Sequence, residues 1–290
     1  MANRRSPFST RCARAMLAEQ TGETMNRMMT LGALLLSAGA VRADIADDFE
    51  SYQIGMVPGG AWQDASTYVV NPTNPGPTVS VIDTTNAQGN ATRSVQITDG
   101  IGSSGGLMAE VAHTGTQRFE IDVRLDQQGN GSAPNWMTAI GFVQNTVQDD
   151  FNWMPQAFVY ASTNGRFRLY VRNADGQTGA SRDFGLNGGV WSMDTWYRVQ
   201  LEADTVAGVF DVTITDLVSG SVIADVSRTY AGWNPEFGQY DLVSVNDGEY
   251  GNNPGTIGNM SSYDNAAYTP APGSVGLLGC AGLIVARRRR

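Results

Sequence analysis

The stretch that decides the fold is Arg118–Gln127, which reads RFEIDVRLDQ. Apolar and polar residues alternate along it, so that one face carries Phe119, Ile121, Val123 and Leu125. This period of two is typical of a β-strand with one face buried and the other in water. No stretch between the two ends of the chain shows a comparable 3.6-residue apolar stripe, so the chain is predicted to fold mainly into strands.

The same pattern extends on both sides of this stretch. The dipeptide Asn164-Gly165 stands between two alternating segments and predicts a β-hairpin. Many short strands with turns rich in Gly, Asn and Asp predict an all-β fold, an antiparallel two-sheet jelly-roll sandwich. The further predicted strands are Ser94–Thr98, Gly106–Val111, Trp136–Gln144, Ala157–Ala161, Arg166–Arg172, Trp196–Ala203, Val209–Asp216, Ser221–Arg228, Tyr240–Val245 and Met260–Tyr268.

The composition excludes several catalytic chemistries. The 290 residues include 19 basic and 28 acidic ones, and every basic residue is arginine. Without lysine the chain can form neither a lysine Schiff base nor the lysine contact of a P-loop. His113 is the single histidine, so no histidine pair can build a zinc site.

The amino-terminal segment is interpreted as a targeting signal. Met25–Ala43 has the three parts of a secretory signal peptide: the basic flank Arg27, an apolar run and a small-residue cleavage site that ends at Ala43. Residues 1–24 are then an upstream extension or, alternatively, a long basic n-region. The mature chain would begin at Asp44.

The carboxyl-terminal segment, residues 269–290, is interpreted as a sorting tail. Its apolar stretch Ser274–Ala286 would form a helix about 20 Å long, short of the roughly 30 Å hydrocarbon core of a bilayer. With Pro270-Ala271-Pro272 before it and four arginines after it, the segment resembles the PEP-CTERM tail of Gram-negative bacteria, although Ala271 replaces the glutamate of that motif. A plain membrane anchor is the alternative.

The resemblance to PEP-CTERM tails has implications for location and partners. It implies an exosortase-like processing enzyme as partner and a transient association of the tail with the inner membrane. It also implies that the protein is exported to the cell surface or extracellular matrix of a Gram-negative-type bacterium.

Residues 44–268 remain as a single domain. They contain 9 arginines and 26 carboxylates, a formal charge of −17, whereas the whole chain carries −9. Such a surface repels nucleic acid and attracts divalent cations, so no nucleic-acid partner is expected. Cys12 and Cys280 both lie outside this range, so the domain would rely on burial of its core rather than on disulfides.

The segment Trp196–Glu202, WYRVQLE, resembles a strand of concanavalin A-like lectin/glucanase and laminin-G-like jelly rolls. Asp47–Tyr52 and Tyr263–Asn265 are similar to the first and last segments of such domains. The resemblance implies one concanavalin A-like jelly roll over residues 44–268, with Trp196 in its core.

A catalytic role is not predicted. Glucanases of this fold carry an acidic strand motif of the form Glu-x-Asp-x-Glu or Glu-x-Asp-x-x-Glu, and Glu120 and Asp122 match its first two acids. The third position falls on Arg124 or Leu125, neither of which can act as the general acid that retaining hydrolysis needs. We therefore expect this strand to present acids and arginines that pair with neighbouring strands. A hydrolase or lyase of the same fold is the alternative.

Ligand binding is predicted on aromatic and arginine side chains. Arg168, Tyr170 and Arg172 lie on the polar face of one predicted strand, and Trp153 lies in a polar loop. An aromatic ring can stack on a sugar, and a guanidinium can bind a uronate carboxylate with two hydrogen bonds. Trp136 is a further stacking candidate, although core packing is the alternative for both tryptophans.

Calcium is the predicted metal. It prefers carboxylate and carbonyl oxygens, and Asp48, Glu50 and Asp264 would meet if the first and last strands pair. The sequence as a whole predicts an exported, non-catalytic carbohydrate-binding or structural module whose partner is an extracellular polysaccharide.

Overall fold

The computed structural model describes residues 45–66, 76–100, 105–113, 115–129, 136–144, 155–174, 179–247 and 258–270. All described strands belong to one compact unit, Ala43–Arg290. The predicted signal peptide and residues 271–290 of the predicted tail lie outside the described residues, as does Trp153. In the described part of the chain, no helix is long and apolar enough to cross a membrane.

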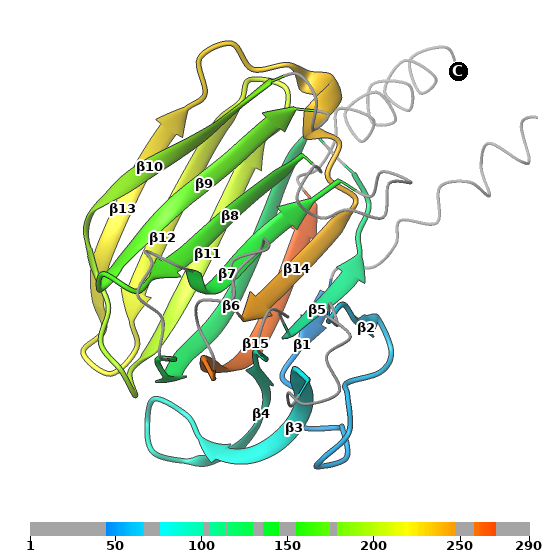
Figure 1. The fold of residues 1–290 in the computed structure, drawn as a ribbon, viewed down its shortest axis with the longest axis vertical. Helices are drawn as coiled ribbons and strands as arrows, with labels where there is room; N and C mark the ends of the chain where they lie inside the picture. The colour runs from blue at the N-terminus through cyan, green and yellow to red at the C-terminus, as the bar shows by residue number, and fades with distance from the viewer. Residues whose placement is uncertain are drawn as a thin grey trace, which may run out of the picture. The chain divides into compact units, whose positions relative to one another are not determined.

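The strands form two antiparallel sheets (Figure 1). The first, here called the β6 sheet, has the order β13-β12-β11-β6-β15-β4-β3, with β1 also paired to β15. Its strands are β1 (Ile45–Asp47), β3 (Thr78–Thr85), β4 (Ala91–Thr98), β6 (Thr116–Gln127), β11 (Trp196–Asp204), β12 (Val209–Asp216), β13 (Ser221–Thr229) and β15 (Met260–Pro270).

The second sheet, here called the β8 sheet, has the order β10-β9-β8-β7-β14-β5-β2. Its strands are β2 (Trp62–Asp64), β5 (Gly105–Glu110), β7 (Trp136–Val143), β8 (Gln156–Ser162), β9 (Arg166–Ala174), β10 (Gly179–Val190) and β14 (Leu242–Asp247). A short 3₁₀ turn, η2 (Pro235–Gly238), precedes β14. The predicted all-β, two-sheet jelly-roll sandwich is confirmed.

The core lies between the two sheets. In β6, Phe119 and Ile121 are fully buried, and they pair with Leu201 and Val199 of β11. Phe119 meets Phe142 of the β8 sheet with ring centroids 6.4 Å apart. The alternating residues of RFEIDVRLDQ therefore divide as predicted, with the apolar face turned to the opposite sheet.

The predicted hairpin at Asn164-Gly165 joins β8 to β9. Gly165 has a φ of +83°, and its N–H donates to the carbonyl of Ser162 at 3.0 Å. A left-handed residue here closes the loop that connects two antiparallel strands, and glycine adopts that conformation without steric cost.

Four strands were not predicted: β1, β2, β3 and β10. β1 and β2 have three residues each, too few for a pattern. β10 reads GASRDFGLNGGV, and its glycines and its irregular register between Gly185 and Val190 hide any alternation. β3 and β10 are edge strands, where one side of the ladder is unpaired and the sequence is less constrained.

Trp196 is buried as predicted but lies on the outer side of its sheet. Its neighbour Tyr197 packs against Phe167 of the β8 sheet, with ring centroids 5.3 Å apart, so Trp196 projects the other way. There its indole N–H donates to the Thr85 carbonyl at 2.8 Å, and Arg124 lies over its ring.

Candidate functional site

The outer face of the β8 sheet carries an apolar cluster that is separate from the core. Every residue of β8 is buried, whereas a strand with one wet face would alternate. Ala157 and Val159 belong to the core, but Phe158 and Tyr160 belong to this second cluster, with Trp136 and Tyr170 packed against it. Phe158 and Tyr160 are thus already covered, and Trp136 and Tyr170 are the partly exposed rings among these four.

The aromatic rings of this face contact one another. Trp136 stacks on Tyr160 with ring centroids 4.7 Å apart, and its centroid lies 5.1 Å from that of Tyr170. A register shift between Trp136 and Thr138 separates the tryptophan from the regular ladder. Trp136 and Tyr170 are partly exposed, so each ring can offer a surface to a ligand.

Asp183 of β10 forms hydrogen bonds with two polar side chains of this face. It accepts from Arg168 Nε at 2.8 Å and from the Tyr160 hydroxyl at 3.0 Å. Burial and the nearby Asp183 carboxylate raise the pKa of Tyr160, so the phenol stays protonated and donates. Arg168 is thereby held beside the aromatic rings.

Gln156 adds a buried polar group to the same face. It lies opposite Arg172 in the β8–β9 register and is 3% exposed, and its side-chain oxygen has no hydrogen-bond partner. Buried oxygens are nearly always paired, so this unpaired oxygen is unusual. The sequence did not single out Gln156.

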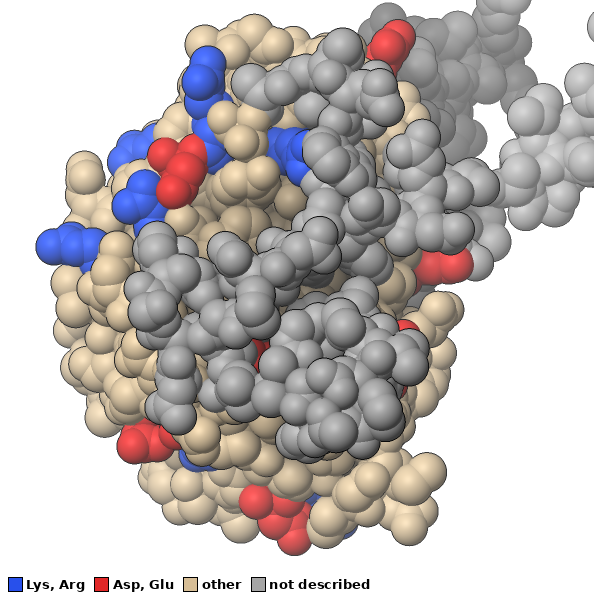
Figure 2. Space-filling view, viewed as in Figure 1, with Lys and Arg blue, Asp and Glu red and all other residues tan. Residues whose placement is uncertain are grey.

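Figure 2 looks onto this face and shows basic side chains gathered on the side of β9 and β10. β9 carries Arg166, Arg168 and Arg172, which are three of the nine arginines of residues 44–268. The structure thus brings the predicted residues Arg168, Tyr170 and Arg172 to one face and adds Trp136 to them.

The predicted pairing of the acidic strand with an arginine of a neighbouring strand is confirmed for Asp122 of the β6 sheet. Asp122 accepts from Arg198 Nε at 2.7 Å and from its Nη2 at 3.0 Å. Glu120 pairs with Arg118 at 2.7 Å, and Asp126 pairs with Arg124. The pairs of Glu120 and Asp126 thus form within β6 itself, whereas the pair of Asp122 joins β6 to β11.

The three predicted calcium ligands are arranged around hydrogen-bond donors. Glu50 Oε1 accepts from the Thr92 hydroxyl at 2.6 Å, Asp264 Oδ2 lies 3.3 Å from the same hydroxyl, and Asp48 accepts from the Glu50 N–H at 3.2 Å. Among the described residues, no group of three or more His, Cys, Asp or Glu could hold a metal ion. Calcium binding stays a prediction, and unfolding temperatures with and without a chelator would test it.

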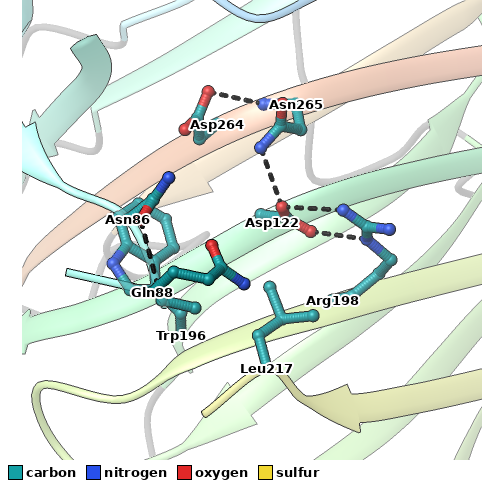
Figure 3. Close-up of a pocket in the computed structure, with 9 residues that line it drawn as sticks. Asn86, Gln88, Asp122, Trp196, Arg198, Leu217, Asp264 and Asn265 are labelled. Carbon is teal, nitrogen blue, oxygen red and sulfur yellow. Dashed lines mark hydrogen bonds and ion pairs between the residues drawn. The ribbon is translucent and has the colours of Figure 1, made fainter. Parts of the chain in front are cut away.

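A pocket of about 190 Å³ opens on the outer face of the β6 sheet (Figure 3). Asp122, Trp196, Arg198, Asp264 and Asn265 are among the residues that line it. Burial raises the pKa of Asp264 to about 6, and the negative charge of Asp122 contributes to this rise. The hydrogen bonds that Asp264 accepts lower the pKa but do not cancel the effect of burial. No local sequence pattern indicates this pocket, because β6, β11 and β15 each contribute only one or two of its residues.

Comparisons with known proteins concern the fold alone. No protein-family model and no curated protein sequence matches the chain. Among solved structures, the cellulose induced protein Cip1 is similar over 78% of this chain and 96% of that chain, with 17% identity and a TM-score of 0.46.

Two further structures are similar at a comparable level. An alginate lyase from Klebsiella pneumoniae aligns with 66% of this chain and 85% of its own, with 10% identity and a TM-score of 0.45. Peanut lectin aligns with 72% of this chain and 97% of its own, with 10% identity and a TM-score of 0.38. These neighbours are lectin-like jelly-roll proteins.

Proposed function

We propose that this protein is a non-catalytic carbohydrate-binding protein that binds an acidic polysaccharide on the outer face of the β8 sheet. The observation that carries the proposal is the aromatic cluster of Trp136, Phe158, Tyr160 and Tyr170 beside the arginine-bearing strand β9.

The chemistry of this face suits a chain of uronate sugars. A partly exposed aromatic ring packs against the C–H face of a sugar, and planar guanidinium groups bind carboxylates in a fork. The rest of the domain is strongly acidic, so a local group of arginines would favour this face over others for an anionic polymer.

Titration calorimetry tests the proposal with alginate and polygalacturonate as acidic polymers and laminarin as a neutral one. We expect the acidic polymers to bind, and we expect Tyr170→Ala or Arg172→Ala to weaken binding about tenfold, as for the loss of one stacking or charged contact. Arg118→Ala on the opposite sheet is the matched control and should bind like the wild type. Equal affinity in all variants would contradict the proposed face.

The same incubations separate binding from catalysis. Unsaturated sugar ends or new reducing ends would favour the alternative, a polysaccharide lyase or hydrolase of this fold. The absence of binding to every polymer would favour a purely structural matrix protein.

Export remains part of the proposal and rests on the sequence of the two ends. We expect the chain produced in its host to begin at Asp44 and to be found at the cell surface or in the matrix after processing by an exosortase-like enzyme. Mass spectrometry of the cell-surface fraction tests this. A chain that retains residues 25–43 would contradict the signal peptide, and one that retains residues 271–290 would indicate a plain anchor.

A further inference from the structure

The pocket on the outer face of the β6 sheet is a second candidate site (Figure 3). It lies on the sheet opposite the aromatic cluster and shares no residue with it. Its walls come from the turn that contains Asn86 and Gln88, from β6, β11 and β15, and from Leu217. An inference about this pocket therefore does not depend on the proposed function.

A bulge in β15 shapes one wall of the pocket. Asp264 and Asn265 are consecutive, yet both line the pocket, whereas consecutive residues of a regular strand point to opposite faces. The β15–β6 register shifts between Asp264 and Ala267, and Asn265 has a φ of +50°. Bulges of this kind re-aim side chains and are common beside functional sites.

Hydrogen bonds hold the side chains of another wall in place. Asp122 is 4% exposed, and its two oxygens accept from Arg198 and from Asn265 Nδ2, the latter at 2.9 Å. The indole of Trp196 is held in place by its hydrogen bond to the Thr85 carbonyl. These contacts order the wall before any ligand arrives, which lowers the entropic cost of binding.

One oxygen of the Asp264 carboxylate can accept a further hydrogen bond. Its Oδ1 accepts from the Asn265 N–H at 2.8 Å, but its Oδ2 lies 3.3 Å from the Thr92 hydroxyl. That hydroxyl has one hydrogen, and Glu50 Oε1 is closer to it, at 2.6 Å. The ionised Asp264 thus has one weakly engaged oxygen in the pocket.

The mixture of donors and acceptors selects the ligand chemistry. An anion would meet the carboxylates of Asp122 and Asp264, and an ammonium group would meet the guanidinium of Arg198. A hydroxyl group can both donate to Asp264 and accept from the amides of Gln88 or Asn265. The volume equals that of about six water molecules, which suits one sugar ring.

We propose that this pocket binds a single monosaccharide unit, or a polyol of that size, through its hydroxyl groups. Asp264 accepts from the ligand, Gln88 and Asn265 donate to it, and Trp196 forms the apolar wall.

Saturation-transfer NMR on the full chain tests the pocket with glucose, galactose, mannose and myo-inositol as probes. We expect transfer to at least one of them. Asp264→Asn should weaken its binding about tenfold or more, because a hydrogen bond to a charged acceptor is lost. Gln88→Ala should weaken it severalfold, and since Gln88 is exposed in a turn, this variant should fold like the wild type.

Arg118→Ala changes an exposed residue of the same sheet that does not line the pocket, so it is the matched control and should leave transfer unchanged. Transfer to none of the probes, or transfer that neither pocket variant reduces, would overturn the proposal. Displacement of the sugar by methylammonium or by acetate would overturn the assigned ligand class. Loss of polysaccharide binding in Tyr170→Ala with sugar binding intact would separate the two sites.

Discussion

A single residue, Asp264, sets much of the electrostatics of the pocket on the β6 sheet. Asp264 is 3% exposed, and burial keeps its pKa near 6 although the Asn265 N–H and Thr92 lower it. The charged groups around it are Glu50, Asp122 and Arg198. At neutral pH the native state therefore holds a buried carboxylate that the unfolded chain would solvate.

Asp264→Asn is expected to stabilise the fold at pH 7 by on the order of 1–3 kcal/mol. The native carboxyl binds its proton more tightly than the unfolded one, so its contribution to stability is present below about pH 4 and is lost as the pH rises through 6. Urea unfolding at pH 4 and pH 7 measures the effect. An equal gain at both values would contradict this cause. The same variant should bind sugar less well, so stability and binding would oppose each other here.

Arg198→Ala is expected to destabilise the fold by about 2 kcal/mol, because it leaves the buried Asp122 without its two charge-assisted hydrogen bonds. Arg198→Lys should restore only part of the loss, since lysine lacks the planar fork. Arg118→Ala breaks a more exposed pair with Glu120 and should cost less than about 1 kcal/mol. Urea unfolding compares the three, and equal losses for Arg198→Ala and Arg118→Ala would contradict the importance of burial.

At the scale of elements, the hairpin of β8 and β9 is central to the proposed binding face. It carries Tyr160, Arg168, Tyr170 and Gln156 on its outer side and the core residues Val159 and Leu169 on its inner side. A shift of its register by one residue would exchange the two faces, so the turn that closes it also positions the site.

Gly165→Ala is expected to cost about 1 kcal/mol, because the residue has a φ of +83° and an added Cβ disfavours that conformation. No atom lies within 4 Å of the added Cβ, so the cost would be conformational rather than a clash. Gly59→Ala is the matched control, since Gly59 has the same open surroundings without a left-handed φ. Thermal unfolding tests the pair, and equal unfolding temperatures would contradict the argument.

At the scale of the whole molecule, two buried aspartates with raised pKa values, Asp99 and Asp264, lower stability as the pH rises. Burial raises the pKa of Asp99 to about 7 despite its hydrogen bonds from Gly258 and Asn259, and Asp264 titrates near 6. Glu50 and Asp216 have lowered pKa values and titrate below this range.

The protein is therefore expected to become less stable as the pH rises from 5 to 8, because the native state must release protons from buried sites that the unfolded chain has already released. The double variant Asp99→Asn/Asp264→Asn should flatten most of this dependence. Unfolding temperatures measured across the range test it, and a wild-type temperature that rises with pH would contradict it.

The alternation in the sequence was enough to predict most of the described strands, although β1, β2, β3 and β10, which also contribute to the core, gave no clear pattern. It was also enough to place Arg168, Tyr170 and Arg172 together, because residues two apart on a strand share a face. The position of Trp136 on this face was harder to predict, since a register shift separates the residue from the regular strand pattern. Gln156 gave no signal, because only its burial on an outer face makes it unusual.

The sequence by itself determined most of the strands and the inward and outward faces of β6, because these follow from local alternation. Only the tertiary structure decided which strands are neighbours. Asp122 and Asp264 lie opposite each other because β15 pairs with β6, and a bulge then brings Asn265 beside them. Such juxtapositions depend on long-range strand pairing, which no local pattern encodes.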